Sequence, residues 1–169
     1  MSELEGSSGK EFKGRKRIDS ISGYRFKPKD EELILDYLMR KVHGLTLPMD
    51  DIHYVDLYSC DPDNLTANFP KVGDDEWYFF TPRDRKYHNG SRPSRSTPTG
   101  YWKATGVAVD IFNTRDLDIV NPIGKKRTLV YYVGAPNDKN AKTSWTMQEY
   151  TLIGERRTRL GPNDMRAES

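Results

Sequence analysis

The strongest constraint on the fold of this chain is a change in the pattern of residue types near Glu76. From that point on, short runs of aromatic and β-branched residues alternate with Gly, Pro, Asn and Asp. Such runs are typical of strands, and connections this short favour hairpins over crossover helices. The second half of the chain therefore predicts a mostly antiparallel sheet. The expected strands are 77–81, 101–105, 107–112, 117–120, 127–133 and 144–152.

The first half carries one clear helical pattern, over residues 30–42. Acidic residues stand at its start and basic residues at its end, which suits the helix dipole, and its apolar residues form one stripe. The members of the stripe are Leu33, Ile34, Tyr37, Leu38 and Val42. A shorter helical segment is expected over 52–60, followed by a turn at 61–64.

The two ends of the chain differ from the middle in composition. Residues 1–20 are rich in Gly, Ser, Lys and Glu and nearly free of large apolar groups, so we expect a flexible tail. Residues 154–169 predict a loose C-terminal segment. One folded domain is therefore expected over 21–153.

The composition excludes several classes of protein. The single cysteine, Cys60, cannot form an internal disulfide, and three scattered histidines supply no two-plus-two spacing for a structural zinc site. The chain has no run of 18 apolar residues and its N-terminus lacks a signal-peptide pattern. We expect neither a membrane partner nor secretion.

No enzyme motif is found in the sequence. It contains no Gly-x-Gly, no Gly-x-Ser-x-Gly and no His-Glu-x-x-His. The acidic pair Glu31-Glu32 suits a helix N-terminus better than acid-base catalysis. We therefore expect no catalytic residues, no cofactor and no small-molecule substrate.

The net charge of +2 hides an asymmetry along the chain. Residues 21–80 carry 6 basic and 12 acidic side chains, whereas residues 81–135 carry 10 basic and 4 acidic ones. A basic block of this kind indicates a face that attracts a polyanion, although charge alone leaves open a set of solvated loops. Two short basic clusters, 13–17 and 125–127, are candidate nuclear import signals.

Within the basic block, residues 82–95 form a candidate phosphate-binding loop, with five bases and one acid around a turn. The strand that follows has a two-residue period. This period puts Tyr101, Lys103 and Thr105 on one face and Trp102 and Ala104 on the other.

Such a strand or a narrow ribbon fits the major groove of DNA. There Lys and Thr can reach base edges while Arg side chains neutralise phosphates. An ordinary amphipathic strand is the alternative that composition leaves open.

The order and spacing of these segments resemble the NAC domain of plant transcription factors. The resemblance spans roughly residues 21–153 and rests on separated blocks in family order. The matching blocks are Gly23-Tyr24-Arg25-Phe26, Asp30-Glu31-Glu32-Leu33, Val55-Asp56-Leu57, Glu76-Trp77-Tyr78-Phe79-Phe80, Pro82-Arg83-Asp84-Arg85-Lys86-Tyr87, Asn89-Gly90-Ser91-Arg92-Pro93, Gly100-Tyr101-Trp102-Lys103-Ala104-Thr105-Gly106, Gly124-Lys125-Lys126-Arg127-Thr128-Leu129-Val130-Tyr131-Tyr132, Ala135-Pro136 and Trp145-Thr146-Met147-Gln148-Glu149-Tyr150.

The resemblance implies an α+β fold, with a twisted antiparallel β-sheet flanked by a few helices. It implies a sequence-specific regulator of transcription that acts in the nucleus, binds double-stranded DNA and reads a short CGT-type core. It implies no enzyme activity, no metal and no cofactor. By analogy, the DNA-binding residues are Arg83, Arg85, Lys86, Arg92, Arg95, Tyr101, Lys103, Thr105, Lys125 and Lys126.

The resemblance also implies a homodimer or a heterodimer with related domains. Arg25 and Glu32 match the pair that links the two subunits. The sequence departs from the family at Lys29, where a Thr often caps the helix, and this leaves Asp30 as the nearest cap candidate. Residues 107–109 replace a charged stretch, so we expect DNA affinity or site preference to differ.

One alternative of a different class stays open. A domain that pairs with related domains and binds DNA weakly or not at all would act as a protein-interaction module that inhibits related transcription factors. The basic loop disfavours this alternative, and the apolar residues 107–109 favour it.

Overall fold

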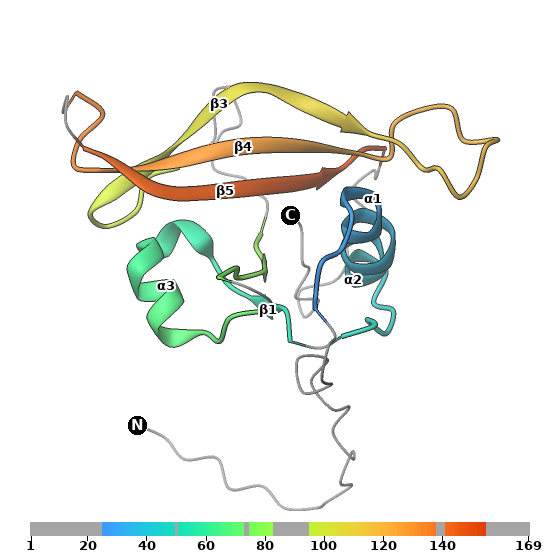
Figure 1. The fold of residues 1–169 in the computed structure, drawn as a ribbon, viewed down its shortest axis with the longest axis horizontal. Coiled ribbons are helices and arrows are strands. Elements are labelled where there is room, and N and C mark those ends of the chain that lie inside the picture. The colour runs from blue at the N-terminus through green and yellow to red at the C-terminus, as the bar shows by residue number, and fades with distance from the viewer. Residues whose placement is uncertain (1–24, 50, 73–74, 83–94, 138–140, 155–169) are drawn as a thin grey trace, which may run out of the picture.

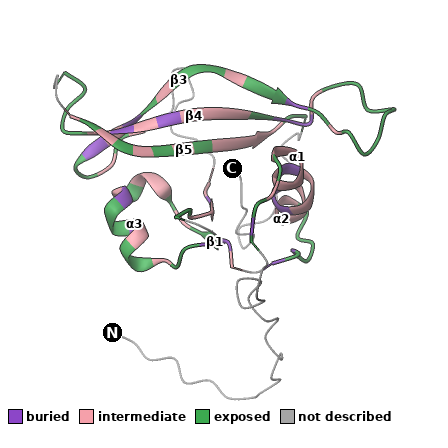
Figure 2. Ribbon diagram, in the orientation of Figure 1, coloured by how far each residue is buried: buried purple, intermediate pink, exposed green. Residues whose placement is uncertain are grey.

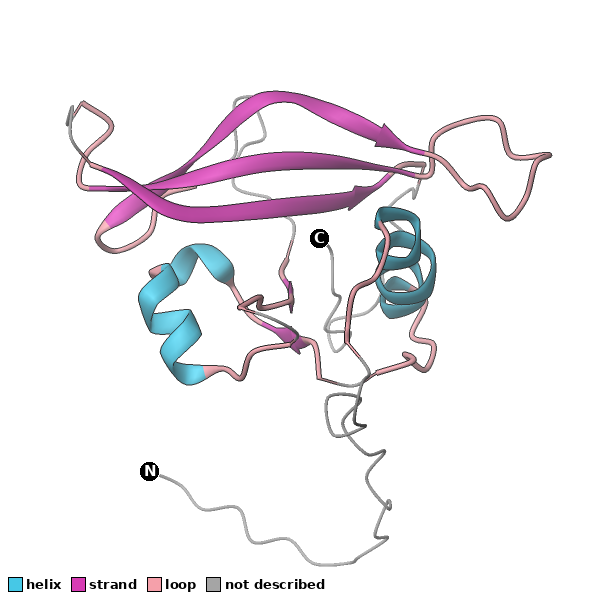
Figure 3. Ribbon diagram, viewed as in Figure 1, coloured by secondary structure: helices cyan, strands magenta, loops and turns pink. Residues whose placement is uncertain are grey.

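Three long strands form one layer of the structure, and the helices lie beneath them (Figure 1). The computed structural model describes residues 25–49, 51–72, 75–82, 95–137 and 141–154. The sheet has the order β3 (Gly100–Ile111), β4 (Gly124–Val133) and β5 (Lys142–Leu152), and both pairs of neighbours are antiparallel. Figure 3 shows these strands above the helices. The expected α+β fold class is therefore confirmed.

The helix predicted over residues 30–42 is confirmed. It consists of α1 (Asp30–Glu32), a wider π-helical segment (Leu33–Leu38) and α2 (Met39–Val42) in direct succession. Its apolar stripe contacts the sheet, and Ile34 at its centre is fully buried. Ile34 lies so close to β4 that a Cβ built on Gly124 would be 2.7 Å from the Ile34 Cδ1 atom. A side chain at this crossing would require the Ile34 side chain to move and would also lie 2.8 Å from the Thr151 carbonyl oxygen of β5, so glycine fits best here.

A second helix, α3 (Pro62–Asn68), lies under the other end of the sheet (Figure 1). Above it, Trp102, Leu129 and Tyr131 form a second core cluster, distinct from the cluster around Ile34. Leu129 and Gly124 are five residues apart in β4, so the Leu129 side chain and a Cβ built on Gly124 point to opposite faces. The two helices therefore cover opposite faces of one sheet at its two ends, and the right-handed twist of the strands turns both faces downward in Figure 1.

Two of the expected strands are one strand in the structure. Segments 101–105 and 107–112 join as β3, which is interrupted by a shift of register between Thr105 and Val109. Gly106 sits in this interruption with a φ of +66°, a left-handed conformation that favours glycine. The glycine that suggested a break between two strands therefore forms a bulge within one.

The prediction of a strand at 117–120 is wrong. These residues lie in the connection between β3 and β4, and Leu117 and Val120 are among the most exposed apolar side chains of the described residues. The Asp116 carboxylate accepts a hydrogen bond from the Asp118 N–H at 3.1 Å, and the Asp116 carbonyl accepts one from the Ile119 N–H at 3.2 Å. These local bonds form a turn, which the apolar alternation did not reveal.

The turn expected at 61–64 is also wrong, because α3 begins there. Pro62 is its first residue, a position at which proline loses no helical hydrogen bond. In the segment 52–60, only a short 3-10 turn, Leu57–Ser59, is helical, and β1 (His53–Tyr54) pairs with β2 (Phe79–Phe80) in parallel. The strand expected at 77–81 is confirmed only for these two phenylalanines.

Burial follows the layers (Figure 2). The buried side chains lie where the sheet meets the helices, and β3 is largely exposed along its middle. None of the helices in the described ranges is long and apolar enough to cross a membrane. The expected tail at 1–20 and the C-terminal segment beyond 154 lie outside the described residues.

Candidate nucleic-acid interface

The sequence-predicted site divides into a described and an undescribed part. Four of the basic-loop residues, Arg83, Arg85, Lys86 and Arg92, lie outside the described residues. The others lie on β3, on β4 and in the segment that leads into β3. Their positions allow each predicted role to be compared with its surroundings.

The alternation expected in β3 is present. Trp102 is buried, with 7% of its surface exposed, and its ring lies 5.2 Å from that of Tyr131 in the second core cluster. Lys103 and Thr105 are exposed on the opposite face. Thr105 is opposite Thr128 in β4, so a row of hydroxyl groups continues across the strands.

Lys103 lies over an aromatic surface. Tyr101 and Tyr132 are cross-strand neighbours whose rings stack at 5.3 Å with an angle of 12° between their planes, and the Lys103 Nζ atom is 5.9 Å from the Tyr132 ring. No described acidic residue forms an ion pair with Lys103. Its ammonium group therefore lies near the stacked tyrosine rings and can interact with a negatively charged or hydrogen-bond-accepting ligand.

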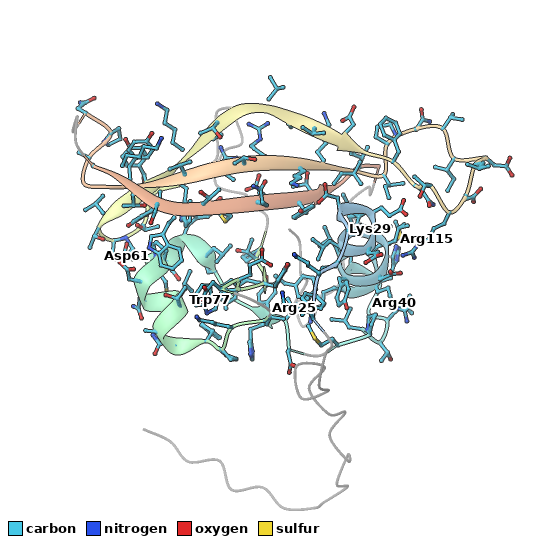
Figure 4. The ribbon with its side chains drawn as sticks, in the orientation of Figure 1. Arg25, Lys29, Arg40, Asp61, Trp77 and Arg115 are labelled. Carbon is cyan, nitrogen blue, oxygen red and sulfur yellow. The ribbon has the colours of Figure 1, made fainter. Side chains whose placement is uncertain are left out.

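Asp61 holds the segment that enters β3. Its Oδ1 atom accepts hydrogen bonds from the Thr97 hydroxyl at 2.6 Å, the Thr99 N–H at 3.0 Å and the Tyr131 hydroxyl at 2.9 Å. Burial alone raises the pKa of Asp61, but these hydrogen bonds together outweigh burial and lower the pKa below its ordinary value of 3.8. The ionised carboxylate therefore fixes the start of the strand to the beginning of α3 (Figure 4).

Arg95 lies on the side of the sheet opposite to Lys103. Its side chain is only 15% exposed, and its Nη2 atom is 3.4 Å from the Glu149 carboxylate. The same carboxylate accepts a hydrogen bond from the Tyr58 hydroxyl at 3.3 Å. Burial, followed by the Glu149 charge, raises the pKa of Tyr58 to about 12. Arg95 is thus held in a half-buried cluster beside the core.

Lys125 and Lys126 are neighbours in β4 whose side chains point to opposite faces. The Lys126 Nζ atom is 3.3 Å from the Asp30 carboxylate, which also accepts a hydrogen bond from the Tyr150 hydroxyl at 2.7 Å. The Lys125 Nζ atom is 3.9 Å from Asp110. The cluster 125–127, a candidate import signal, lies inside a paired strand, so an import receptor could bind it as an extended peptide only if β4 were displaced.

Of the two residues expected at a dimer interface, Glu32 lies in α1, whereas Arg25 lies in the segment that leads to α1. Arg25 is exposed, and the Glu32 carboxylate accepts a hydrogen bond from the Lys29 N–H at 3.1 Å (Figure 4). Lys29 is the N-cap residue and its side chain can only donate, so no side chain caps the helix from this position. Asp30, expected as the nearest cap candidate, instead binds Lys126 and Tyr150.

Sequence reasoning missed three residues of this region. Asp61 was assigned to a turn, although Asp followed by Pro is also a signature of a helix start. Tyr132 and Glu149 carried no signal, because their importance depends on which residue of a neighbouring strand each one faces. That register appears only in the folded sheet.

Comparison with known proteins gives a consistent result. A family model described as No apical meristem (NAM) protein matches residues 21–152. NAC transcription factor 47 of Arabidopsis thaliana is 50% identical over 130 residues, which is 77% of this chain and 36% of that protein. NAC domain-containing protein 18 of the same plant is 46% identical over 138 residues, 82% of this chain and 42% of that protein.

A rice relative extends the comparison beyond Arabidopsis. NAC domain-containing protein 10 of Oryza sativa subsp. japonica is 48% identical over 132 residues, 77% of this chain and 30% of that protein. The chain thus spans less than half the length of each of these curated relatives.

Proposed function

This chain belongs to the NAC (No apical meristem) family, and from that membership we propose that it binds double-stranded DNA in a sequence-specific manner and regulates transcription in the nucleus. The observation that carries the proposal is the uncovered face of β3 and β4 beside α3. This face carries Lys103, Thr105 and the stacked Tyr101 and Tyr132, and no helix of the described residues lies against it. The proposed function does not include enzyme activity.

The uncovered face suits the major groove. A strand pair fits into the groove, and the spacing of side chains along one face is about 6.6–6.8 Å. Lys103 would donate to a base-edge acceptor such as a guanine O6 or N7 atom, and the Thr105 hydroxyl would serve either a donor or an acceptor. A short CGT-type core, which the family resemblance implies, offers such acceptors.

The remaining basic residues are proposed to bind phosphates. Arg83, Arg85, Lys86 and Arg92 belong to the basic block of the sequence and would follow the DNA backbone. Arg95, Lys125 and Lys126 each lie near a carboxylate of the protein, so a phosphate must compete with that carboxylate for them. We therefore expect these three to contribute less to DNA affinity than Lys103.

Dimerisation through Arg25 and Glu32 is part of the proposal. In a two-fold symmetric dimer each Arg25–Glu32 contact occurs twice, so one charge-reversing substitution disrupts two ion pairs. We expect Arg25→Glu to weaken the dimer and Arg25→Glu with Glu32→Arg to restore it in part. An exposed ion pair contributes only about 0–1 kcal/mol, so the pair selects the register of a larger interface. Light scattering that shows a monomer at micromolar concentration of wild type would contradict this part.

The decisive experiment for the proposed function is selection from a pool of random duplexes. The expected result is enrichment of a short CGT-type core, with an affinity that falls steeply as salt rises, because each neutralised phosphate releases condensed counterions. A wild-type protein that binds no duplex at low salt, or that prefers single strands, overturns the proposal. A dimer that binds no duplex would instead support the interaction module.

A further inference from the structure

The bulge in β3 follows immediately after the residues proposed to read DNA. Thr105 is opposite Thr128 and Val109 is opposite Lys126, so β3 advances four residues while β4 advances two. The two extra residues push the strand outward, and β3 arches away from β4 at its middle (Figure 1). Because β3 is the edge of its sheet, nothing in the described ladder lies beyond the bulge.

Val107 is at the tip of this bulge. It follows Gly106, whose positive φ turns the chain, and its side chain is 85% exposed. A single exposed valine on a protein surface needs no explanation. Val107 differs because it stands two residues after Thr105, in the bulge of the edge strand that also carries Lys103.

Valine at this position has the chemistry to recognise one feature of the major groove. Thymine presents a C5 methyl group there, and an apolar side chain in contact with it distinguishes T from bases that lack the methyl. The β-branched side chain of valine has few rotamers, so little rotational freedom is lost when it is fixed against a base.

We infer that Val107 is a specificity-determining residue that contacts a thymine methyl group beside the bases read by Lys103. This inference rests on the proposed function, and it assigns to the bulge the recognition of an apolar group. Strand β3 then recognises polar base-edge groups through Lys103, on its paired part, and an apolar methyl group through Val107, in its bulge.

The test is a cycle of two changes, one on the DNA and one on the protein. Each thymine in and beside the selected core is replaced in turn by deoxyuridine, which lacks only the C5 methyl. For wild type we expect one replacement to weaken binding about three- to fivefold, the effect of losing one buried methyl group. For Val107→Ala, we expect the thymine and deoxyuridine duplexes to bind equally at that position.

A matched control is available in Val120, which is 76% exposed and lies in the β3–β4 connection, beyond the end of β3. Val120→Ala should discriminate between thymine and deoxyuridine as wild type does. Both variants remove exposed side chains, so both should melt as wild type does, which excludes loss of folding as the cause.

The outcomes separate the inference from the proposed function. If wild type binds its selected duplex but no deoxyuridine replacement weakens binding, the inference about Val107 is wrong and DNA binding stands. The inference is equally wrong if Val107→Ala retains the methyl discrimination, or if Val120→Ala loses it. A wild type that binds no duplex overturns both.

Discussion

The two ends of the sheet present the same face to different surroundings. Near α1 this face carries Lys126 and Ile111, which lie against the first helix: Ile111 is 6% exposed, and Lys126 pairs with Asp30. Near α3 the same face carries Lys103 and Thr105, and no described helix lies against them. The twist of the sheet causes the difference, because it turns opposite faces toward the helical layer at the two ends.

The end near α1 is closed by more than the helix. The connection from β3 to β4 is held to the helix by two acidic side chains, Glu31 and Asp36. The Glu31 carboxylate accepts hydrogen bonds from the Thr114 N–H at 2.7 Å and the Thr114 hydroxyl at 2.8 Å, and Arg115 binds Asp36 at 2.6 Å. The hydrogen bond from Arg115 holds the pKa of Asp36 below its usual value. This end of the face therefore has its charges satisfied within the protein.

The residues packed against a strand lysine determine whether its ammonium group is paired within the protein or available to a ligand. Lys103 and Lys126 belong to the same sheet face and each lies near a tyrosine ring, yet among the described residues only Lys126 has a carboxylate partner. Covered lysines stabilise the fold, and uncovered lysines are available to a ligand. Each of the following predictions tests one side of this contrast.

The largest loss of stability is expected in the second core cluster, at the end of the sheet near α3. Trp102→Ala removes a ring that is 93% buried and should lower the free energy of unfolding by about 3–5 kcal/mol. Lys103→Ala, one residue away on the other face, should leave the melting temperature nearly unchanged. Thermal unfolding compares the melting temperatures of the two variants. A Lys103→Ala protein that melts at a lower temperature than wild type would mean that Lys103, and not Trp102, is on the buried face of β3.

At the covered end, the largest effect is expected from Gly124→Ala. The added Cβ would lie 2.7 Å from the Ile34 Cδ1 atom and 2.8 Å from the Thr151 carbonyl oxygen. Overpacking of this kind should cost about 1–3 kcal/mol of stability. Denaturant unfolding measures it, and Ile34→Val supplies the second arm of the cycle because it removes the Cδ1 atom. Strictly additive losses in the double variant would contradict close packing at this crossing.

A smaller and pH-dependent effect is expected from Asp61→Asn. The asparagine keeps an acceptor oxygen but loses the charge, so stability at pH 7 should fall by about 1 kcal/mol. Because the folded-state pKa of Asp61 lies below 3.8, its contribution is complete above that pH and is lost as the pH falls through the folded-state value. Unfolding measured across this range should show the wild type and variant converging in acid. A constant difference would exclude a role for the charge.

The smallest effect is expected from Lys126→Ala. Its ion pair with Asp30 is partly exposed, so its loss should change stability by about 0–1 kcal/mol. The comparison is sharpened by Asp30→Asn, which frees the Lys126 ammonium and should increase DNA affinity slightly if a phosphate can then replace the carboxylate. Unchanged affinity would place Lys126 outside the DNA contact.

Sequence patterns predicted much of this fold where the signal is local. The stripe over 30–42 and the alternation of Trp102 with Lys103 depend only on neighbours along the chain, and both are confirmed. The turn expected at 61–64 was wrong because the Asp-Pro pair, which suits a turn or a helix start, begins α3. The strand expected at 117–120 was wrong because local hydrogen bonds to Asp116 form a turn there. Composition alone does not reveal such bonds.

The site was predictable only in part, since its character depends on partners distant in sequence. Lys126 and Asp30 are separated by 96 residues, and Arg95 and Glu149 by 54. Period-two reasoning applied to neighbours already separates Lys125 from Lys126. It does not reveal that the first helix covers one of them, because that depends on the twist of the whole sheet.

The contrast between an uncovered and a covered lysine is tested by comparing the DNA binding of Lys103→Ala with that of Lys126→Ala. The affinities of both variants and of wild type are measured for the selected duplex and for random duplex over a range of salt. We predict that Lys103→Ala reduces the difference in binding free energy between the selected and the random duplex by about 1–3 kcal/mol, whereas Lys126→Ala leaves this difference unchanged. A uniform loss for Lys103→Ala with a salt slope smaller by about one unit would reassign it to phosphate. Equal losses of affinity for the two variants, or a Lys103→Ala protein that binds as wild type does, would show that Lys103 does not contact a base edge.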